Sequence, residues 1–184
     1  MSWKPWALLA AAAVIVFWMV GAYNRLMALR NRIGAAWSEV DRARLRRADA
    51  AEPLLAALRA PLAAEQGALE SFGNAHALAV QAAERVSAMP VSAAATSAWV
   101  RAESTLSSAA ARLLALAQQH EAWQGDPTLA ALATPWHDAH KQIAAARTLF
   151  DHAAADYNAA LAQAPTRWLR RLFGFEPAGL LGPA

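Results

Sequence analysis

The chain opens with an uncharged apolar run, and apolar positions spaced seven residues apart follow it. The run from Pro5 to Asn24 holds 20 consecutive uncharged residues. A helix of about 20 apolar residues crosses the roughly 30 Å hydrocarbon core of a bilayer. Aromatic residues, which favour the headgroup layer, stand near both ends of the run. We therefore expect a transmembrane anchor over residues 1–24, which includes Trp6, Phe17, Trp18 and Tyr23.

A cleaved signal peptide is the alternative interpretation of the same run. Val20, Gly21 and Ala22 loosely fit a small-residue cleavage site. The run is longer than the apolar region of a signal peptide, however, and the bulky Phe17, Trp18 and Met19 crowd the site. We favour an uncleaved, single-pass anchor.

The charges that flank the anchor predict its orientation. Lys4 and the terminal amine precede it, and the arginines that follow are Arg25, Arg30, Arg32, Arg42 and Arg44. Segments rich in Lys and Arg stay on the cytoplasmic side of a membrane. We expect a bacterial inner-membrane protein with its large domain in the cytoplasm.

Four helical segments are predicted after the anchor. The first continues from the membrane to Arg59, with a kink at Pro53, and ends at Pro61. Its two apolar rows, seven residues apart within each row, are Leu26, Ile33, Val40 and Leu54, and Leu29, Ala36, Ala43, Ala50 and Ala57. A second helix ends before Pro90, and a polar turn at residues 124–127 ends the third.

The fourth helix has the most regular pattern. Its first row is Leu129, Trp136, Ile143, Phe150, Tyr157 and Ala164, in which all but the last are large. Its partner row is Leu132, Ala139, Ala146, Ala153 and Ala160. Alanine opposite large residues lets antiparallel helices approach closely, and a strict seven-residue repeat indicates coiled-coil packing. Thr134-Pro135 also allows a short separate first turn. The predicted fold is all-α: an anchor helix that continues into an antiparallel up-down four-helix bundle over residues 25–164.

An up-down bundle returns the chain to the membrane after its fourth helix. Residues 165–184 therefore form a tail near the bilayer. The basic and aromatic residues of this tail are Arg167, Trp168, Arg170, Arg171, Phe173 and Phe175. They suit a surface of anionic lipid headgroups. The alternative is that the aromatic residues cap the open end of the bundle, and the two roles are compatible.

Composition narrows the chemistry. The chain holds 52 alanines and no cysteine, which favours helices and excludes disulfides, cysteine-ligated metals and a cysteine nucleophile. The net charge is +3, and the densest basic run, residues 42–47, spreads around a helix rather than forming a nucleic-acid groove. The sequence has neither a Gly-x-Ser-x-Gly turn nor a glycine-rich phosphate loop. We expect no enzymatic activity, no cofactor, no nucleic-acid partner and no small-molecule substrate.

Three polar residues fall on core positions of the repeats: Arg47, His76 and His120. One interpretation is a buried hydrogen-bonded layer that fixes helix register, with Asp49 as a further partner. The interpretation that we favour is that the repeats drift and these side chains reach solvent.

A second histidine cluster has metal-ligand spacing. His137 and His140 stand three residues apart, with Asp138 between them. A di-iron site in a helical bundle needs Glu three residues before His on facing helices, and no glutamate here has that spacing. We interpret His137 and His140 as an exposed pair and expect no metal.

The chain resembles the LemA family in ordered blocks spread over residues 23–175. The motif positions that carry the resemblance are Asn24, Leu29, Arg30, Asn31, Trp37, Asp41, Leu113, Leu114, Arg147, Tyr157 and Asn158. The resemblance implies a single-span membrane protein with a helical bundle, and it implies no reaction. The pattern is barely visible between residues 60 and 98, and Phe150-Asp151 replaces the family's tyrosine-asparagine pair.

These features predict a membrane-anchored scaffold or adaptor for protein partners that the sequence does not identify, with a second copy of the chain among the candidates. The alternative is a membrane-linked sensor or receptor whose bundle packing responds to a ligand or lipid. Pro53, Gly67 and Gly73 are the weak points at which such a bundle would rearrange.

Overall fold

The structure, a computed structural model, describes residues 4–120, 127–163, 166, 170 and 173–182. Within these ranges the chain forms four α-helices and no strand: α1 (Lys4–Leu58), α2 (Gln66–Ala88), α3 (Ala93–Gln119) and α5 (Pro127–Ala162). The predicted all-α class and the four helical segments are confirmed.

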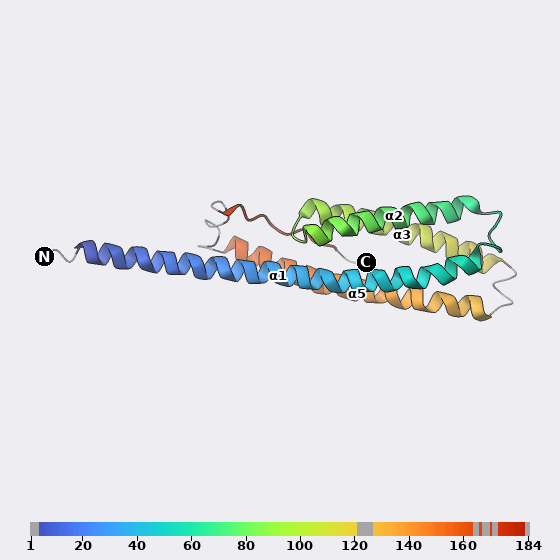
Figure 1. Ribbon diagram of the computed structural model, residues 1–184, viewed down its shortest axis with the longest axis horizontal. Helices are drawn as coiled ribbons and strands as arrows, with labels where there is room; N and C mark the ends of the chain where they lie inside the picture. Colours follow the sequence, from blue (N-terminus) through green and yellow to red (C-terminus); the bar gives the residue numbers. More distant parts are fainter. Residues whose placement is uncertain (1–3, 121–126, 164–165, 167–169, 171–172, 183–184) are drawn as a thin grey trace.

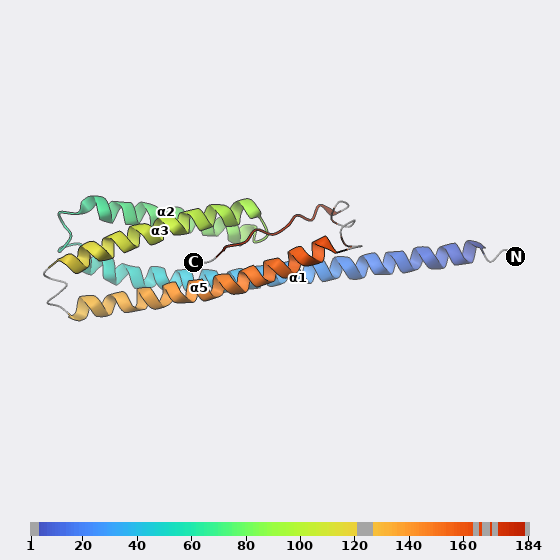
Figure 2. The same cartoon turned by 180° about the vertical axis from the view of Figure 1, so that it is seen from behind.

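The helices lie side by side along one long axis, and consecutive helices run in opposite directions (Figure 1). α1 packs chiefly along α5, and α2 packs chiefly along α3. The reverse view shows the same two pairs (Figure 2). The N-terminal half of α1 extends beyond the other helices as a single rod (Figure 1).

The two helix pairs bury a common apolar core. The half nearer the projecting part of α1 is built around Trp37, Trp99, Phe150 and Tyr157. The half farther from it is built around residues that include Phe72, Leu113 and Trp136. Alanines from all four helices fill many of the remaining buried positions, and their small side chains let the helix axes approach.

The repeat of α5 is confirmed wherever its side chains are described. Trp136, Ile143, Phe150 and Tyr157 are at most 5% exposed, and the alanines of the partner row are equally enclosed. On α1 the large row is also buried, but most of the predicted alanine row is only half-buried. The second buried row of α1 lies four residues after the first and contains Trp37, Ala51 and Leu58. A helix that faces two neighbours needs such a wide apolar stripe.

One detail of the helix boundaries differs from prediction. α5 continues from Pro127 through Pro135 without a separate first turn. Pro135 is exposed, so its ring meets no neighbouring helix. Leu62 precedes α2 in a turn, yet it is 2% exposed because it closes the end of the core. Pro53 lies inside α1, and the last turns of α1 bend in Figure 1.

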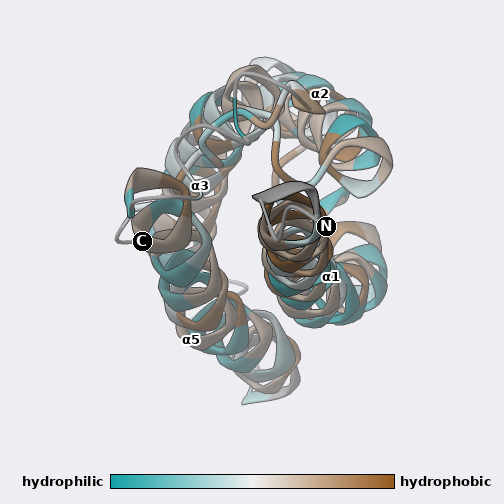
Figure 3. Ribbon diagram, turned by 90° about the vertical axis from the view of Figure 1, so that its left-hand side faces the viewer, coloured by the Kyte–Doolittle hydropathy of each residue, from teal (hydrophilic) through white to brown (hydrophobic). Residues whose placement is uncertain are grey.

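The projecting part of α1 is apolar and uncovered. Among the described residues, α1 is the one helix long and apolar enough to cross a membrane, judged by length and composition alone. None of its apolar window is buried. Figure 3, which looks along the long axis from the N-terminal side, shows the hydrophobic colour of this segment.

Candidate functional site

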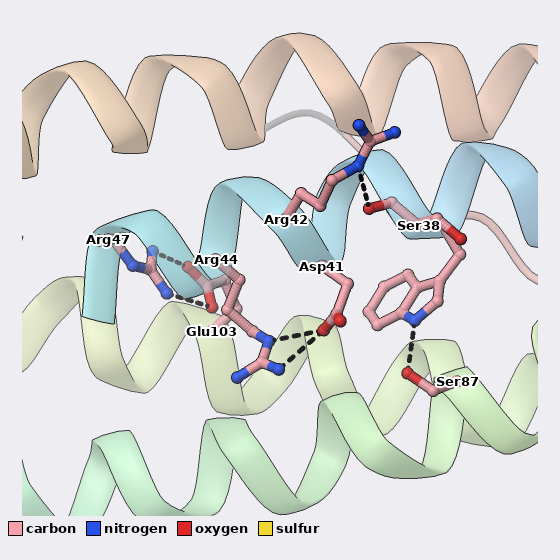
Figure 4. Close-up of polar contacts among 8 residues, drawn as sticks. Ser38, Asp41, Arg42, Arg44, Arg47, Ser87 and Glu103 are labelled. Atoms are coloured by element: carbon pink, nitrogen blue, oxygen red, sulfur yellow. Dashed lines mark hydrogen bonds and ion pairs between the residues drawn. The ribbon is translucent and has the colours of Figure 1, made fainter. Parts of the chain in front are cut away.

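A buried ion pair joins the C-terminal part of α1 to the middle of α3. Arg47 donates two hydrogen bonds to the carboxylate of Glu103, one of them from Nη2 to Oε2 at 2.9 Å (Figure 4). The two side chains are 2% and 3% exposed. The Arg47 guanidinium also lies over the Trp136 ring, 5.2 Å from its centroid. Bidentate geometry is directional, so the pair fixes how α1, α3 and α5 align.

Two half-buried histidines flank the ion pair, His76 from α2 and His140 from α5. Burial, followed by the positive charge of Arg47, lowers the pKa of both below the usual 6.5. His76 stacks on Phe72 with 4° between the ring planes. Each histidine borders a surface recess, about 290 Å³ at His76 and about 140 Å³ at His140. Both rings therefore favour the neutral form at pH 7.

The predicted polar layer is only partly formed. Arg47 is buried, so the solvent interpretation is wrong for this residue, whereas His120 is exposed. Asp49 is exposed and is not the partner of Arg47. Two residues along a helix correspond to about 200° of rotation, so Asp49 points away from the core that Arg47 enters.

A cluster of aromatic side chains lies between the Arg47–Glu103 ion pair and the projecting part of α1. The Trp37 Nε1–H donates to Ser87 Oγ at 2.8 Å, a contact drawn in Figure 4. The Trp37 ring meets Trp99 edge-on at 5.3 Å and Phe150 at 6.2 Å between centroids. The Arg147 guanidinium lies over the Trp99 ring at 5.5 Å. These contacts join all four helices, because Ser87 belongs to α2 and Trp99 to α3.

The histidine pair with metal-ligand spacing does not converge on one point. His137 is exposed, whereas His140 is half-buried. Asp138 pairs with Lys141 at 3.3 Å instead of joining the histidines. Within the described ranges, no group of three potential metal ligands is gathered.

The predicted anchor residues are all exposed. The exposed fractions are 70% for Trp6, 78% for Phe17, 39% for Trp18 and 37% for Tyr23. The lower value for Tyr23 reflects its contact with the tail, where its ring centroid lies 5.3 Å from that of Phe173 and 5.8 Å from that of Phe175.

The two tail aromatics have different environments. Phe175 is 7% exposed and packs into the core, as the capping interpretation predicts, whereas Phe173 is 47% exposed. Phe173 and four residues of α1 line an apolar recess of about 220 Å³ at the base of the projecting helix. Arg170 is exposed. Arg167, Trp168 and Arg171 lie outside the described residues.

The family-motif residues separate by depth. Trp37, Leu113, Arg147 and Tyr157 are buried; Leu29, Asp41, Leu114 and Asn158 are half-buried; Asn24, Arg30 and Asn31 are exposed. Asp41 accepts hydrogen bonds from the Arg44 Nε and Nη2 at 3.0 and 2.7 Å (Figure 4). Burial raises the pKa of the Tyr157 hydroxyl and lowers that of the Arg147 guanidinium. The four buried residues of this motif therefore pack between the helices.

Glu103 was not among the predicted site residues. Its spacing could have identified it. Glu103 lies four residues after Trp99 and three before Leu106, so its carboxylate falls on the buried face of α3. A charged residue on an apolar stripe requires a partner, and the one arginine on a core repeat position, Arg47, was the candidate.

The structure defines an all-α protein in which one helix is both an exposed apolar segment and a core element. The model of the LemA family matches residues 36–182, which include nearly all of the packed helices and the tail. The chain belongs to the LemA family. No curated protein matches it.

Proposed function

We propose that this protein is a single-pass membrane scaffold, which holds a cytoplasmic four-helix bundle close to the bilayer for protein partners. One observation carries the proposal: α1 is continuous over 55 residues. Its first part is apolar and exposed, and its second part contributes Leu26, Ile33 and Val40 to the core at 0% exposure. An anchor that is also a core helix couples the position of the bundle rigidly to the membrane.

The base of α1 has the residues expected at a membrane surface. Tyr23 and Phe173 gather there, and aromatic side chains favour the headgroup layer. Arg25, Arg30 and Arg32 follow and are exposed, which supports a cytoplasmic bundle by the positive-inside rule. Exposed Arg170 adds charge to the same end, where anionic headgroups are the proposed lipid contact.

The buried polar groups support a structural role rather than catalysis. Arg47 and Glu103 satisfy each other, and Trp37 is engaged with Ser87. Each of these contacts joins two helices. We therefore assign no enzymatic activity to the protein, and we attribute the alternating helix directions and alanine-rich contacts to coiled-coil-like packing of the bundle.

A sensor function is the second candidate, and the recess at the base of α1 favours it. Val16, Met19 and Val20 line this recess together with Tyr23 and Phe173. An acyl chain seated there would contact the anchor and the tail at once. Spin labels on α2 and α3 should then report a change in their separation when lipid chain length changes, and an unchanged separation would leave the scaffold proposal alone.

Membrane insertion is tested by charge placed in the apolar run. Leu9→Arg with Val14→Arg should release the protein from membranes at alkaline pH, because each arginine costs about 2.5–3.5 kcal/mol within a span. Leu78→Arg with Leu149→Arg is the matched control, since both residues are exposed on the packed helices. Equal membrane retention of the two variants would contradict the anchor.

Orientation is tested with single cysteines, which the native chain lacks. A membrane-impermeant thiol reagent applied to intact cells should label Ser2→Cys and spare Leu149→Cys. The reverse result would place the bundle outside the cytoplasm.

Protein partners are tested by cross-linking through the same Leu149→Cys variant, followed by recovery of the adducts. Recovery of the chain without any adduct would oppose a scaffold.

A further inference from the structure

The C-terminal tail folds back against the helices instead of leaving the molecule. Residues 175–182 contain no regular secondary structure, and they run back from the anchor end toward the middle of the molecule (Figures 1 and 2). Every third side chain turns inward: Phe175 is 7%, Ala178 6% and Leu181 1% exposed. The segment is thus seated as an extended peptide in an apolar groove.

Three polar side chains of α5 form hydrogen bonds with the backbone of this segment. Asn158 donates from Nδ2 to the Ala178 carbonyl at 2.9 Å and accepts from the Ala178 N–H at 2.8 Å. The Asp151 carboxylate accepts from the N–H groups of Leu181 and Gly182 at 2.7 and 2.9 Å. Contacts of this kind recognise an extended chain by its main-chain groups.

Arg147 completes the row. Its Nη2 donates to the Leu181 carbonyl at 2.6 Å. Arg147, Asp151 and Asn158 are spaced four and seven residues apart, which places them on one face of α5. Arg147 is 7% exposed, so the groove contains a desolvated charge directed at a peptide carbonyl. Such a charge–dipole contact is costly to leave unmade.

The opposite wall of the groove selects one residue by size. A Cβ at Gly179 would lie 2.1 Å from Thr96 Oγ1 and 2.7 Å from the Ala93 Cα at the start of α3. The second distance is to a backbone atom, so it is not relieved by a side-chain rotation. The groove therefore accepts glycine between two buried residues, and it rejects any larger side chain at that point.

The chain that joins α5 to the tail is long enough for exchange between molecules. Residues 163–174 can span at most about 40 Å when extended. A bundle two helices wide measures about 20 Å, because packed helix axes are about 10 Å apart. Copies anchored in one membrane face the same way, so their grooves and tails lie at the same height. This last point rests on the proposed anchoring; the groove itself does not.

We propose that Arg147, Asp151 and Asn158 of α5, with the start of α3, form a peptide-binding groove that takes the tail segment 175–182 of a second copy of this chain in exchange for its own. The ligand class is an extended peptide with three apolar residues spaced by three, as Phe175, Ala178 and Leu181 are, and a glycine directly after the second. Exchange links neighbouring copies without any further surface.

The first experiment uses the full chain in detergent, which makes it independent of membrane insertion. Gly179→Val should disable the tail and leave the groove empty. A labelled peptide of residues 174–182 should then bind this variant at least tenfold more tightly than it binds the native chain, whose groove is filled. The same peptide carrying valine at position 179 should not bind. Failure of the glycine peptide to bind a variant with native helix content would overturn the groove.

The second experiment tests exchange between copies by complementation. Asp151→Leu with Asn158→Leu disables the groove and preserves the tail. Mixed with the Gly179→Val chain, it should give energy transfer between single-cysteine labels at least fivefold above that of either variant alone. Peptide binding without this association would overturn the assignment to a second copy. If Gly179→Val loses helix content, Leu181→Gln serves as the tail variant, and the same two outcomes apply.

Discussion

At the scale of single residues, the Arg47–Glu103 pair dominates the electrostatics of the core. Removing two charges from water costs several kcal/mol per ion, and good geometry is needed to recover it. The bidentate contact and the Trp136 face provide that geometry. The pair therefore specifies the alignment of the helices more than it stabilises them.

We predict an asymmetry between single and double replacement of this pair. Glu103→Gln should lower the free energy of unfolding by about 3–5 kcal/mol, because it leaves Arg47 charged and buried. Arg47→Met with Glu103→Leu should recover most of that loss in the same chemical denaturation measurement. The exposed Arg42–Glu39 pair is the control, and Glu39→Gln should cost less than about 1 kcal/mol. A double variant as unstable as the single would contradict this account.

The histidines beside the pair predict a pH dependence. Burial and Arg47 depress the folded pKa of His76 and His140 below 6.5, so the unfolded chain takes up protons at a higher pH than the folded chain. Stability should therefore be complete above 6.5 and fall as the pH is lowered toward the folded pKa values. The denaturation midpoint measured across this window should show the loss.

Replacement of both histidines by glutamine should flatten that dependence. His152 is exposed on α5, so His152→Gln is the matched control and should retain the native slope. An unchanged slope in the His76→Gln, His140→Gln variant would assign the pH dependence to other groups.

At the scale of elements, the helices divide into two that carry a proline and two that do not. Pro53 lies in α1 and Pro135 in α5, and both are exposed. Each removes one backbone hydrogen bond and crowds the preceding turn. The packing of α1 along α5 keeps both helices continuous at their prolines.

Pro53→Ala should raise the free energy of unfolding by about 1–3 kcal/mol, because it restores a helical hydrogen bond at an exposed site. Pro135→Ala is the matched comparison in α5. A destabilised Pro53→Ala variant would show instead that the bend after Pro53 is needed to seat Leu54 and Leu58 in the core. Thermal unfolding followed by circular dichroism distinguishes the two results.

The sequence predicted the positions of the helices better than the contacts between them. Both buried rows of α5 could be predicted, because a seven-residue repeat of large residues and alanines is visible within one helix. The second row of α1 was misplaced because α1 contacts two neighbours, and a pattern for one seam misses the wider stripe. Arg47 falls on a core repeat position, but the sequence favoured its exposure to solvent, because its partner Glu103 lies 56 positions away. Nothing local pairs those two positions.

The contacts between α5 and the tail segment 175–182 could not be predicted from the sequence either. Asn158 belongs to the family motif and Asp151 departs from it, yet neither spacing nor composition indicates that both bind the tail backbone. Gly179 gave no signal at all, since its restriction comes from Ala93 and Thr96 in another helix. Such contacts require the folded arrangement.

At the scale of the whole molecule, one end combines the exposed apolar part of α1, the Tyr23–Phe173 contact and the exposed Arg170. The opposite end holds the turn that joins α1 to α2 (Figure 1). This polarity agrees with the proposed anchoring of one end of the molecule in a bilayer.

The tail arginines should contribute to lipid binding by charge. In a fragment lacking residues 1–24, replacement of Arg167, Arg170 and Arg171 by Glu should weaken binding to anionic vesicles roughly 100-fold or more, at about 1 kcal/mol per lost basic residue. The control reverses three arginines that are exposed on α2 and α3, Arg85, Arg101 and Arg112. Equal loss in both variants would indicate net charge alone, and vesicle flotation measures the difference.

Under the proposed anchoring, the unbroken course of α1 makes the protein a lever. The part of α1 from Arg25 to Leu58 is about 51 Å long at 1.5 Å per residue. A bilayer that becomes thinner tilts a long span, and a tilt of about 10° would carry the far end of this arm sideways by about 9 Å. A change in membrane thickness would thus be amplified into a displacement of the distal turns, with no rearrangement inside the helices.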